Sequence, residues 1–372
     1  MYSNVVYGHA EWAEHKSSWR HARHFLSIVS SGLIRALAPP VVLCTLVAVM
    51  VSVINYGVMK GLAPSWLPLF KVATVPFSFT APVLALLLVF RTNTSYHRFD
   101  EARRAWGSNV TRSRDLARQS LAWIRHPSDT DKLQCLLRYI KALSFCMKHH
   151  LMENAGSLEE DLIMILENRD EVENVMSSMS RPLYVLQVIS EIINQCQIPD
   201  LERITMDRNI TQCHDNLGAC DRIFKTPIPV AYTRLVSRVL TLWHLVLPFA
   251  LWESCGWLTI LASFVSSAAL FYIEQVGVVI EEPFSILALA SMAKGVLLAI
   301  DGLVSAHTDA LILAWTCRRT YEQKPSPKGS DHVVINLKCP SANDMTSAGN
   351  TKLYIRSLSV SQLQSIPSSI DI

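Results

Sequence analysis

A cluster of arginines directly follows one of the most apolar stretches of the chain. Residues 91 to 118 contain seven arginines and three carboxylates, which gives a local charge of 7 − 3 = +4. A segment of this charge at the end of an apolar helix can concentrate anions from solution. The same cluster can instead mark the side of a membrane on which the segment remains, on a solvated helix face. The candidate anion-attracting residues are Arg91, Arg98, Arg103 and Arg104.

The apolar stretch before these arginines carries a stripe of large side chains. Val75, Phe79 and Val83 are four residues apart, so they share one face of a helix. Thr74 can cap that helix and Pro76 suits its first turn, which places a helix N-terminus within the membrane. Copies of this face arranged around an axis would form a narrow apolar neck that passes anions. The alternative is that the stripe is simply part of a subunit core.

A second pair of arginines lies close to the third apolar stretch. Between Arg238 and Glu253 there are 14 residues, too few to span a membrane, so the helix must begin earlier and draw Arg234 and Arg238 towards the membrane edge. Ionisable residues at such places usually face a bundle interior or water. Folding this hairpin about Ser254 places Arg234 opposite Glu274. Arg234, Arg238 and Glu274 can therefore be interpreted either as a structural ion pair or as part of the vestibule of an ion path.

The remaining polar residues do not follow the spacing of a known catalytic or metal site. Cys213, His214 and Cys220 are close together but lack a zinc-binding pattern. The sequence has no phosphate-binding loop, dinucleotide fingerprint, HExxH motif or nucleophile elbow. Nine scattered cysteines do not indicate a disulfide framework, and a net charge of +3 does not argue for nucleic acid. We therefore expect no enzyme activity, no cofactor, no bound metal and no nucleic-acid partner.

Four apolar stretches must position the candidate residues. The chain has 372 residues, of which 50% are hydrophobic and 17% charged, and a mean hydropathy of +0.24. This mixture indicates a membrane part joined to a water-exposed part. Each stretch is close to the ~20 residues that cross a bilayer as a helix, and short connections join them into two hairpins. The stretches are residues 38–58, 72–90, 228–251 and 256–280.

These patterns predict an all-α membrane protein with four transmembrane helices per subunit and a helical extramembrane bundle. Positive charges precede the first stretch and follow the second, so both termini and the bundle are expected on the same side of the membrane. Serine enrichment predicts a disordered or surface-wrapping tail. The expected organisation is an N-terminal amphipathic segment (1–37), a first transmembrane hairpin (38–90), an extramembrane helical region (91–226), a second hairpin (227–282), a C-terminal helix (283–320) and the tail (321–372).

Three sequence blocks resemble the signature blocks of the bestrophin family of anion channels. They are PFSFTAPVLALLLVFRTNTSYHRFDEARRAWG, TPIPVAYTRLVSRVLTLWHLVLPFALWE and IEQVGVVIEEPFSILAL. The similarity extends over about residues 19 to 290. Within the family, EWAEHKSSWRHARHFLS, LLVFRTNTSY and IPVAYTRLVSR are most similar to the voltage-dependent chloride channels of plant thylakoid membranes.

The resemblance implies a homopentamer with a pore on its fivefold axis. It implies that the second helix lines the neck, at Val75, Phe79 and Val83. It also implies chloride and nitrate as the conducted anions, charge balancing across the thylakoid membrane of chloroplasts as the role, and the stroma as the side that holds the termini and the bundle.

One departure from the family and two rival functions bear on this expectation. Animal bestrophins hold calcium with acids after a Pro-Phe motif, whereas SILALASMAKGV follows Pro283 and Phe284 here, so calcium activation is not expected. A secondary anion transporter usually shows an internal inverted repeat, and the two hairpins differ in their prolines and arginines. A membrane-anchored scaffold or signalling protein would share the helices but conduct no ions.

Overall fold

The structure is a computed structural model that describes residues 6–27, 33–64, 66–152 and 156–322. Within these ranges the regular structure is helical, with no strand. The α-helices are α1 (His9–His15), α2 (Arg20–Ser27), α3 (Leu33–Met59), α4 (Val75–Trp123), α5 (Thr130–Leu151), α6 (Leu158–Leu166), α7 (Arg169–Ser177), α8 (Arg181–Gln195), α9 (Asp200–Lys225), α10 (Val230–Cys255), α11 (Leu258–Glu281) and α12 (Leu289–Glu322). Two short 3-10 helices are η1 (Pro127–Asp129) and η2 (Pro283–Ser285).

The chain divides into two units, residues 1–307 and 308–372. In the second unit the described residues are 308–322, which form the end of α12. The predicted tail therefore lies outside the described residues, apart from Tyr321 and Glu322 at the end of this helix. All further structural description concerns the first unit.

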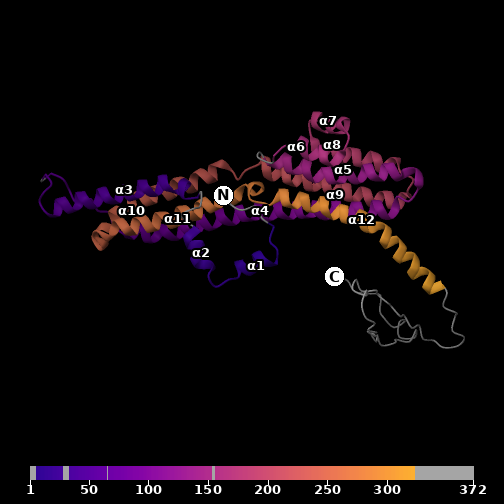
Figure 1. The fold of residues 1–372 in the computed structure, drawn as a ribbon. Helices are drawn as coiled ribbons and strands as arrows, with labels where there is room; N and C mark the ends of the chain where they lie inside the picture. The colour runs from indigo at the N-terminus through magenta and orange to yellow at the C-terminus, as the bar shows by residue number, and fades with distance from the viewer. Residues whose placement is uncertain (1–5, 28–32, 65, 153–155, 323–372) are drawn as a thin grey trace, which may run out of the picture. The chain divides into compact units, whose positions relative to one another are not determined.

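Helix α4 joins the apolar part of the first unit to the polar bundle. It is 49 residues long, about 74 Å, and passes without a break through the boundary that we predicted after Phe90. Its prolines are confined to Pro76, in the first turn, and Pro82, and the residues that follow favour a helix. Thr74 occupies the N-cap position, but its hydroxyl makes no capping bond, contrary to expectation. The first part of α4 packs against α10 and α11, and the second part against α9 and α5 (Figure 1).

The apolar helices pack around α11 rather than as two separate hairpins. Helix α3 packs mainly against α11 and α10, and α4 packs against the same two helices. Asn55 fixes the connection between α3 and α4, because its amide exchanges two 2.8 Å hydrogen bonds with the backbone of Phe70. The shared apolar cluster contains Val41, Cys44, Leu84, Leu88, Val236, Leu240 and Phe271.

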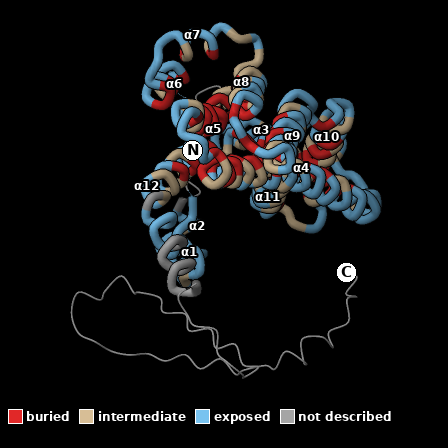
Figure 2. The backbone as a smooth tube through the Cα atoms, turned by 90° about the vertical axis from the view of Figure 1, so that its right-hand side faces the viewer, coloured by how far each residue is buried: buried red, intermediate tan, exposed pale blue. Residues whose placement is uncertain are grey.

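Five helices are long and apolar enough to cross a membrane, one more than the four predicted. Four of them are α3, α4, α10 and α11, and the fifth candidate is Leu289–His307 in α12. Only 17–39% of the most apolar window in each of these helices is buried within the protomer, and Figure 2 shows exposed and intermediate residues among the buried ones in this region. Large exposed apolar surfaces of this kind require lipid or a partner chain to cover them.

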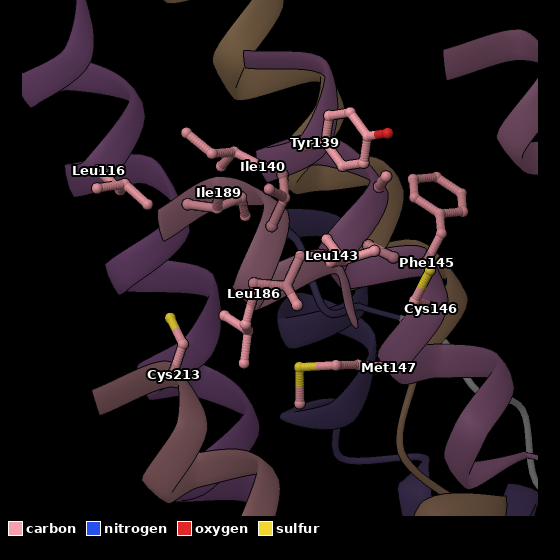
Figure 3. Packing of buried hydrophobic residues seen from close by; sticks show 14 of the residues in the cluster. Leu116, Tyr139, Ile140, Leu143, Phe145, Cys146, Met147, Leu186, Ile189 and Cys213 are labelled. Atoms are coloured by element: carbon pink, nitrogen blue, oxygen red, sulfur yellow. The ribbon is translucent and has the colours of Figure 1, made fainter. Parts of the chain in front are cut away.

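The extramembrane bundle has its own apolar core. The second half of α4 and helices α5, α8 and α9 supply most of it, and Figure 3 shows Leu116, Ile140, Leu186 and Cys213 facing one another. On α5, Leu136, Leu137 and Ile140 are buried and residues 142–148 are buried without a break, so this helix lies at the centre of the core. Leu289, Ala293, Val296 and Ile300 of α12 belong to the same core.

Candidate functional site

The predicted neck residues lie on a free face of α4. Val75, Phe79 and Val83 are 59%, 75% and 58% exposed, so they are not part of the protomer's core. Leu86, seven residues after Phe79 and 53% exposed, continues the same face. The single chain therefore presents an uncovered apolar stripe at the N-terminal end of α4, and the constriction itself stays a prediction.

Aromatic side chains of α10 fix the rotation of α4 from the opposite side. The indole N–H of Trp243 donates to the Thr80 hydroxyl at 3.1 Å, and the Trp243 ring meets the Phe77 ring nearly edge-on at 5.5 Å. One further bond runs from the Tyr232 hydroxyl to the Leu87 carbonyl at 3.2 Å. These contacts hold one side of α4 against α10 and leave the stripe with Phe79 facing away.

Arg91 is not at an open pore mouth, which corrects the prediction made from the basic cluster. Its side chain is fully buried in the protomer. The guanidinium donates to the Thr233 hydroxyl at 2.9 Å and to Glu281 at 3.2 Å, and its Nε lies 3.6 Å from a Glu274 oxygen. Arg91 follows the buried Leu88 by three residues, so it lies on the inward face of α4.

Arg98 also has a structural position. Its guanidinium donates to the backbone carbonyls of Ile223 at 2.6 Å, Thr226 at 2.7 Å and Glu281 at 3.2 Å. Two of these carbonyls lie at the C-terminal ends of α9 and α11, where backbone acceptors lack intrahelical partners. Glu281 in turn accepts the backbone N–H of Ile228 at 3.0 Å. Arg91 and Arg98 therefore join α4 to α9, α10 and α11 where the apolar helices meet the bundle.

Arg103 and Arg104 keep the exposure that an anion-attracting role needs. Their side chains are 59% and 76% exposed. Both pair with Asp100, at 3.1 Å and 2.7 Å, so one carboxylate offsets part of their charge. Exposed pairs of this kind are weak and do not prevent the arginines from attracting anions.

The predicted pairing of Arg234 with Glu274 does not occur, because Glu274 is beside Arg91. Arg234 and Arg238 are both exposed on α10. The preceding residue, Thr233, faces Arg91, and one step along a helix turns the next side chain by about 100°. The predicted hairpin placed Arg234 close to the level of Glu274, since Thr233 and Glu274 both contact Arg91, but on the wrong side of the helix.

An ion-pair cluster in the bundle was not expected from the sequence. Asp161 of α6 accepts the Lys148 ammonium at 2.7 Å and shares a 3.0 Å hydrogen bond with His149, both of which belong to α5. The His149 side chain is only 8% exposed. Burial, the largest influence, lowers the pKa of His149 and outweighs the bond to Asp161, which raises it.

Among the described residues, no group of three or more histidines, cysteines or carboxylates is placed to hold a metal ion. The calcium that animal relatives hold near the Pro-Phe motif does not fit here. Of the two acids before Pro283, Glu281 already accepts hydrogen bonds from Arg91 and from the backbone of Ile228. Glu282 alone falls short of the six to eight oxygens that calcium takes.

Comparison with known proteins agrees with this architecture. Residues 11–301 match the family model described as Bacterial/Fungal Bestrophin protein. The chain belongs to the bestrophin family. The family predicted from the three sequence blocks is therefore confirmed.

Relatives in this family include plant and bacterial proteins. The chain is 40% identical over 285 residues to voltage-dependent chloride channel 1, chloroplastic, of Arabidopsis thaliana, covering 76% of this chain and 69% of that protein. It is 38% identical over 209 residues to a voltage-dependent anion channel-forming protein of Nostoc sp., covering 54% and 67%. A crystal structure of a bacterial bestrophin homolog from Klebsiella pneumoniae superposes with a TM-score of 0.64 at 26% identity, covering 72% of this chain and 98% of that one.

Proposed function

We propose that this bestrophin-family chain is one subunit of a homopentameric, anion-selective channel that conducts chloride and nitrate. The observation that carries the proposal is the uncovered apolar stripe of Val75, Phe79 and Val83 on α4. The channel names of the Arabidopsis and Nostoc relatives support it. Because the Arabidopsis relative is a chloroplastic protein, the proposed location of the channel is the thylakoid membrane, where it would balance charge in a voltage-dependent manner.

A single chain cannot enclose a pore with one helix face, so the proposal requires several copies. A closed ring around a rotation axis presents the same face of each α4 to the centre. In such a ring Phe79 and Val83 would form a narrow apolar neck, which passes weakly hydrated anions more readily than strongly hydrated ones. The positive edge of the Phe79 ring would favour anions over cations.

Entry to the neck would be assisted by charge further along the same helix. Arg103 and Arg104 lie beyond the apolar part of α4 and are exposed, so five copies would surround a vestibule with positive potential. Arg91 and Arg98 would act indirectly, because their contacts fix the orientation of α4 relative to α9, α10 and α11.

The proposed topology has four spans, α3, the first part of α4, α10 and α11. The fifth candidate, Leu289–His307, buries Leu289, Val296 and Ile300 in the bundle core and is therefore assigned to the extramembrane part. The basic residues after the second span support a topology with the bundle and both termini on the positive side, which would be the stroma in a thylakoid.

The test is a planar-bilayer recording of purified protein with chloride on both sides. Phe79→Ala and Val83→Ala should raise unit conductance because they widen and wet the neck. Leu84→Ala is the matched control, since Leu84 is adjacent but 3% exposed on the inward face. It should lower stability by about 2–5 kcal/mol and leave unit conductance unchanged.

Two results would contradict the proposal. Neck variants with unaltered conductance, selectivity and gating would show that this face is not the constriction. Folded wild-type protein that carries no current would favour a membrane scaffold, and saturable transport without channel openings would favour a secondary transporter.

A further inference from the structure

Two arginines of α10 have no protein partner in the described part of the chain. Arg234 and Arg238 are exposed, and neither makes a hydrogen bond or ion pair within those residues. They are four residues apart, which places them on one helix face with roughly 6 Å between their Cβ atoms. This spacing lets both guanidinium groups contact the same small anionic group.

The face that carries them points away from the protomer. Tyr232 bonds to α4, and Val236 is buried in the shared apolar cluster. Each arginine follows one of these residues by two positions, a rotation of about 200° around the helix. Leu235 and Leu242 are 50% and 64% exposed beside them. The two arginines therefore lie on an outward face of α10, next to these exposed leucines.

Their depth matches the edge of the hydrocarbon layer. Helix α10 has 26 residues, so it is about 39 Å long, and the hydrocarbon core of a bilayer is about 30 Å thick. If the helix is centred, Arg234 lies near the boundary and Arg238 roughly 7–8 Å inside it. Long arginine side chains at this depth extend to the headgroup region while their methylene groups stay among apolar neighbours.

Most carboxylates of the membrane-spanning helices already pair with other cations, so few are free to pair with Arg234 and Arg238. Glu253 pairs with Lys71 at the far end of α10, and Glu274 and Glu281 are beside Arg91. Glu282, directly after α11, is exposed and forms no ion pair among the described residues. Copies of this chain packed against the outward face could therefore offer Glu282, whereas Glu274, the acid within the α11 span, is already beside Arg91.

We propose that Arg234 and Arg238 bind the phosphate of an anionic lipid on the positive side of the membrane, with its acyl chains along Leu235 and Leu242. Guanidinium groups bind phosphate oxygens in a two-point geometry that ammonium groups cannot reproduce. Basic residues at this membrane side are suited to anionic headgroups. The proposal depends on the membrane topology proposed above and on no statement about conduction.

The experiment uses the full chain purified in detergent and titrated with phosphatidylglycerol or phosphatidylcholine. Native mass spectrometry gives the bound lipid, and thermal unfolding gives the stabilisation. Wild type should bind phosphatidylglycerol preferentially, and Arg234→Gln/Arg238→Gln should raise the apparent Kd on the order of tenfold or more. Arg234→Lys/Arg238→Lys should recover part of the affinity, because it keeps the charge without the two-point geometry.

The matched control is Arg169→Gln/Arg208→Gln, which removes the same charge from exposed positions of α7 and α9 and should bind lipid like wild type. Three results would overturn the proposal. One is an unchanged lipid affinity in the Arg234/Arg238 variant. Another is an equal loss in Glu282→Gln, which would indicate an ion pair between copies. The third is lowered unit conductance with unchanged lipid affinity, which would place the arginines in the ion path. Absence of current with lipid binding retained would contradict the channel function alone.

Discussion

Replacing Arg91 by glutamine removes the buried charge that holds α4 against α10 and α11. The variant loses the hydrogen bonds to Thr233 and Glu281 and the proximity to Glu274, and leaves two largely buried carboxylates without their cation. Removing one partner of a buried ion pair costs about 3–5 kcal/mol. We expect a loss of this size in the free energy of unfolding, measured by denaturant titration of the purified protein with tryptophan fluorescence as the signal.

Arg104→Gln is the matched control on the same helix. Arg104 is 76% exposed and pairs with Asp100 at 2.7 Å, so its removal should cost less than about 1 kcal/mol. In the double variant Arg91→Gln/Glu281→Gln the loss should be smaller than the sum of the single losses, because the unpaired carboxylate is removed too.

Equal losses for Arg91→Gln and Arg104→Gln would refute the buried assignment of Arg91. So would an Arg91→Gln variant of normal stability whose unit conductance falls, and falls more at low salt, because an arginine in the ion path would behave in that way. A structural Arg91 predicts fewer assembled channels with unchanged unit conductance.

Two further predictions concern protons and calcium. Burial lowers the pKa of His149 below its ordinary 6.5, so the folded state binds fewer protons there, and the stability that His149 contributes is present above pH 6.5 and is lost as the pH falls through the lowered pKa. Wild type should therefore lose more stability from pH 7 to 5 than His149→Gln. Equal pH slopes of the unfolding midpoint would contradict this. Since Glu281 is held by Arg91 and the Ile228 backbone, a calcium chelator should leave the current through purified channels unchanged, and steep activation by micromolar calcium would show that a site exists.

The helical class, the apolar stretches and the family could be predicted from the sequence, because each depends on local composition and order. The shared helix face of the neck residues was predictable in the same way, because Val75, Phe79 and Val83 are spaced four residues apart. Their exposure agrees with a face that the protomer does not cover. The C-terminal helix was also predicted, although not that Leu289–His307 is long and apolar enough to span a membrane; burial in a bundle core and burial in lipid require the same residue types.

Only the tertiary structure decided what the charged residues do. Sequence spacing places Arg91 on a helix but cannot give the rotation of that helix against α10 and α11, and its partner Glu281 is 190 positions away. The same uncertainty gave Arg234 the wrong partner, and it concealed the carbonyl contacts of Arg98 and the burial of His149. A rotation of about 100° per residue separates an arginine that faces its own protein from one that faces outward, and long-range packing of the helices selects between the two.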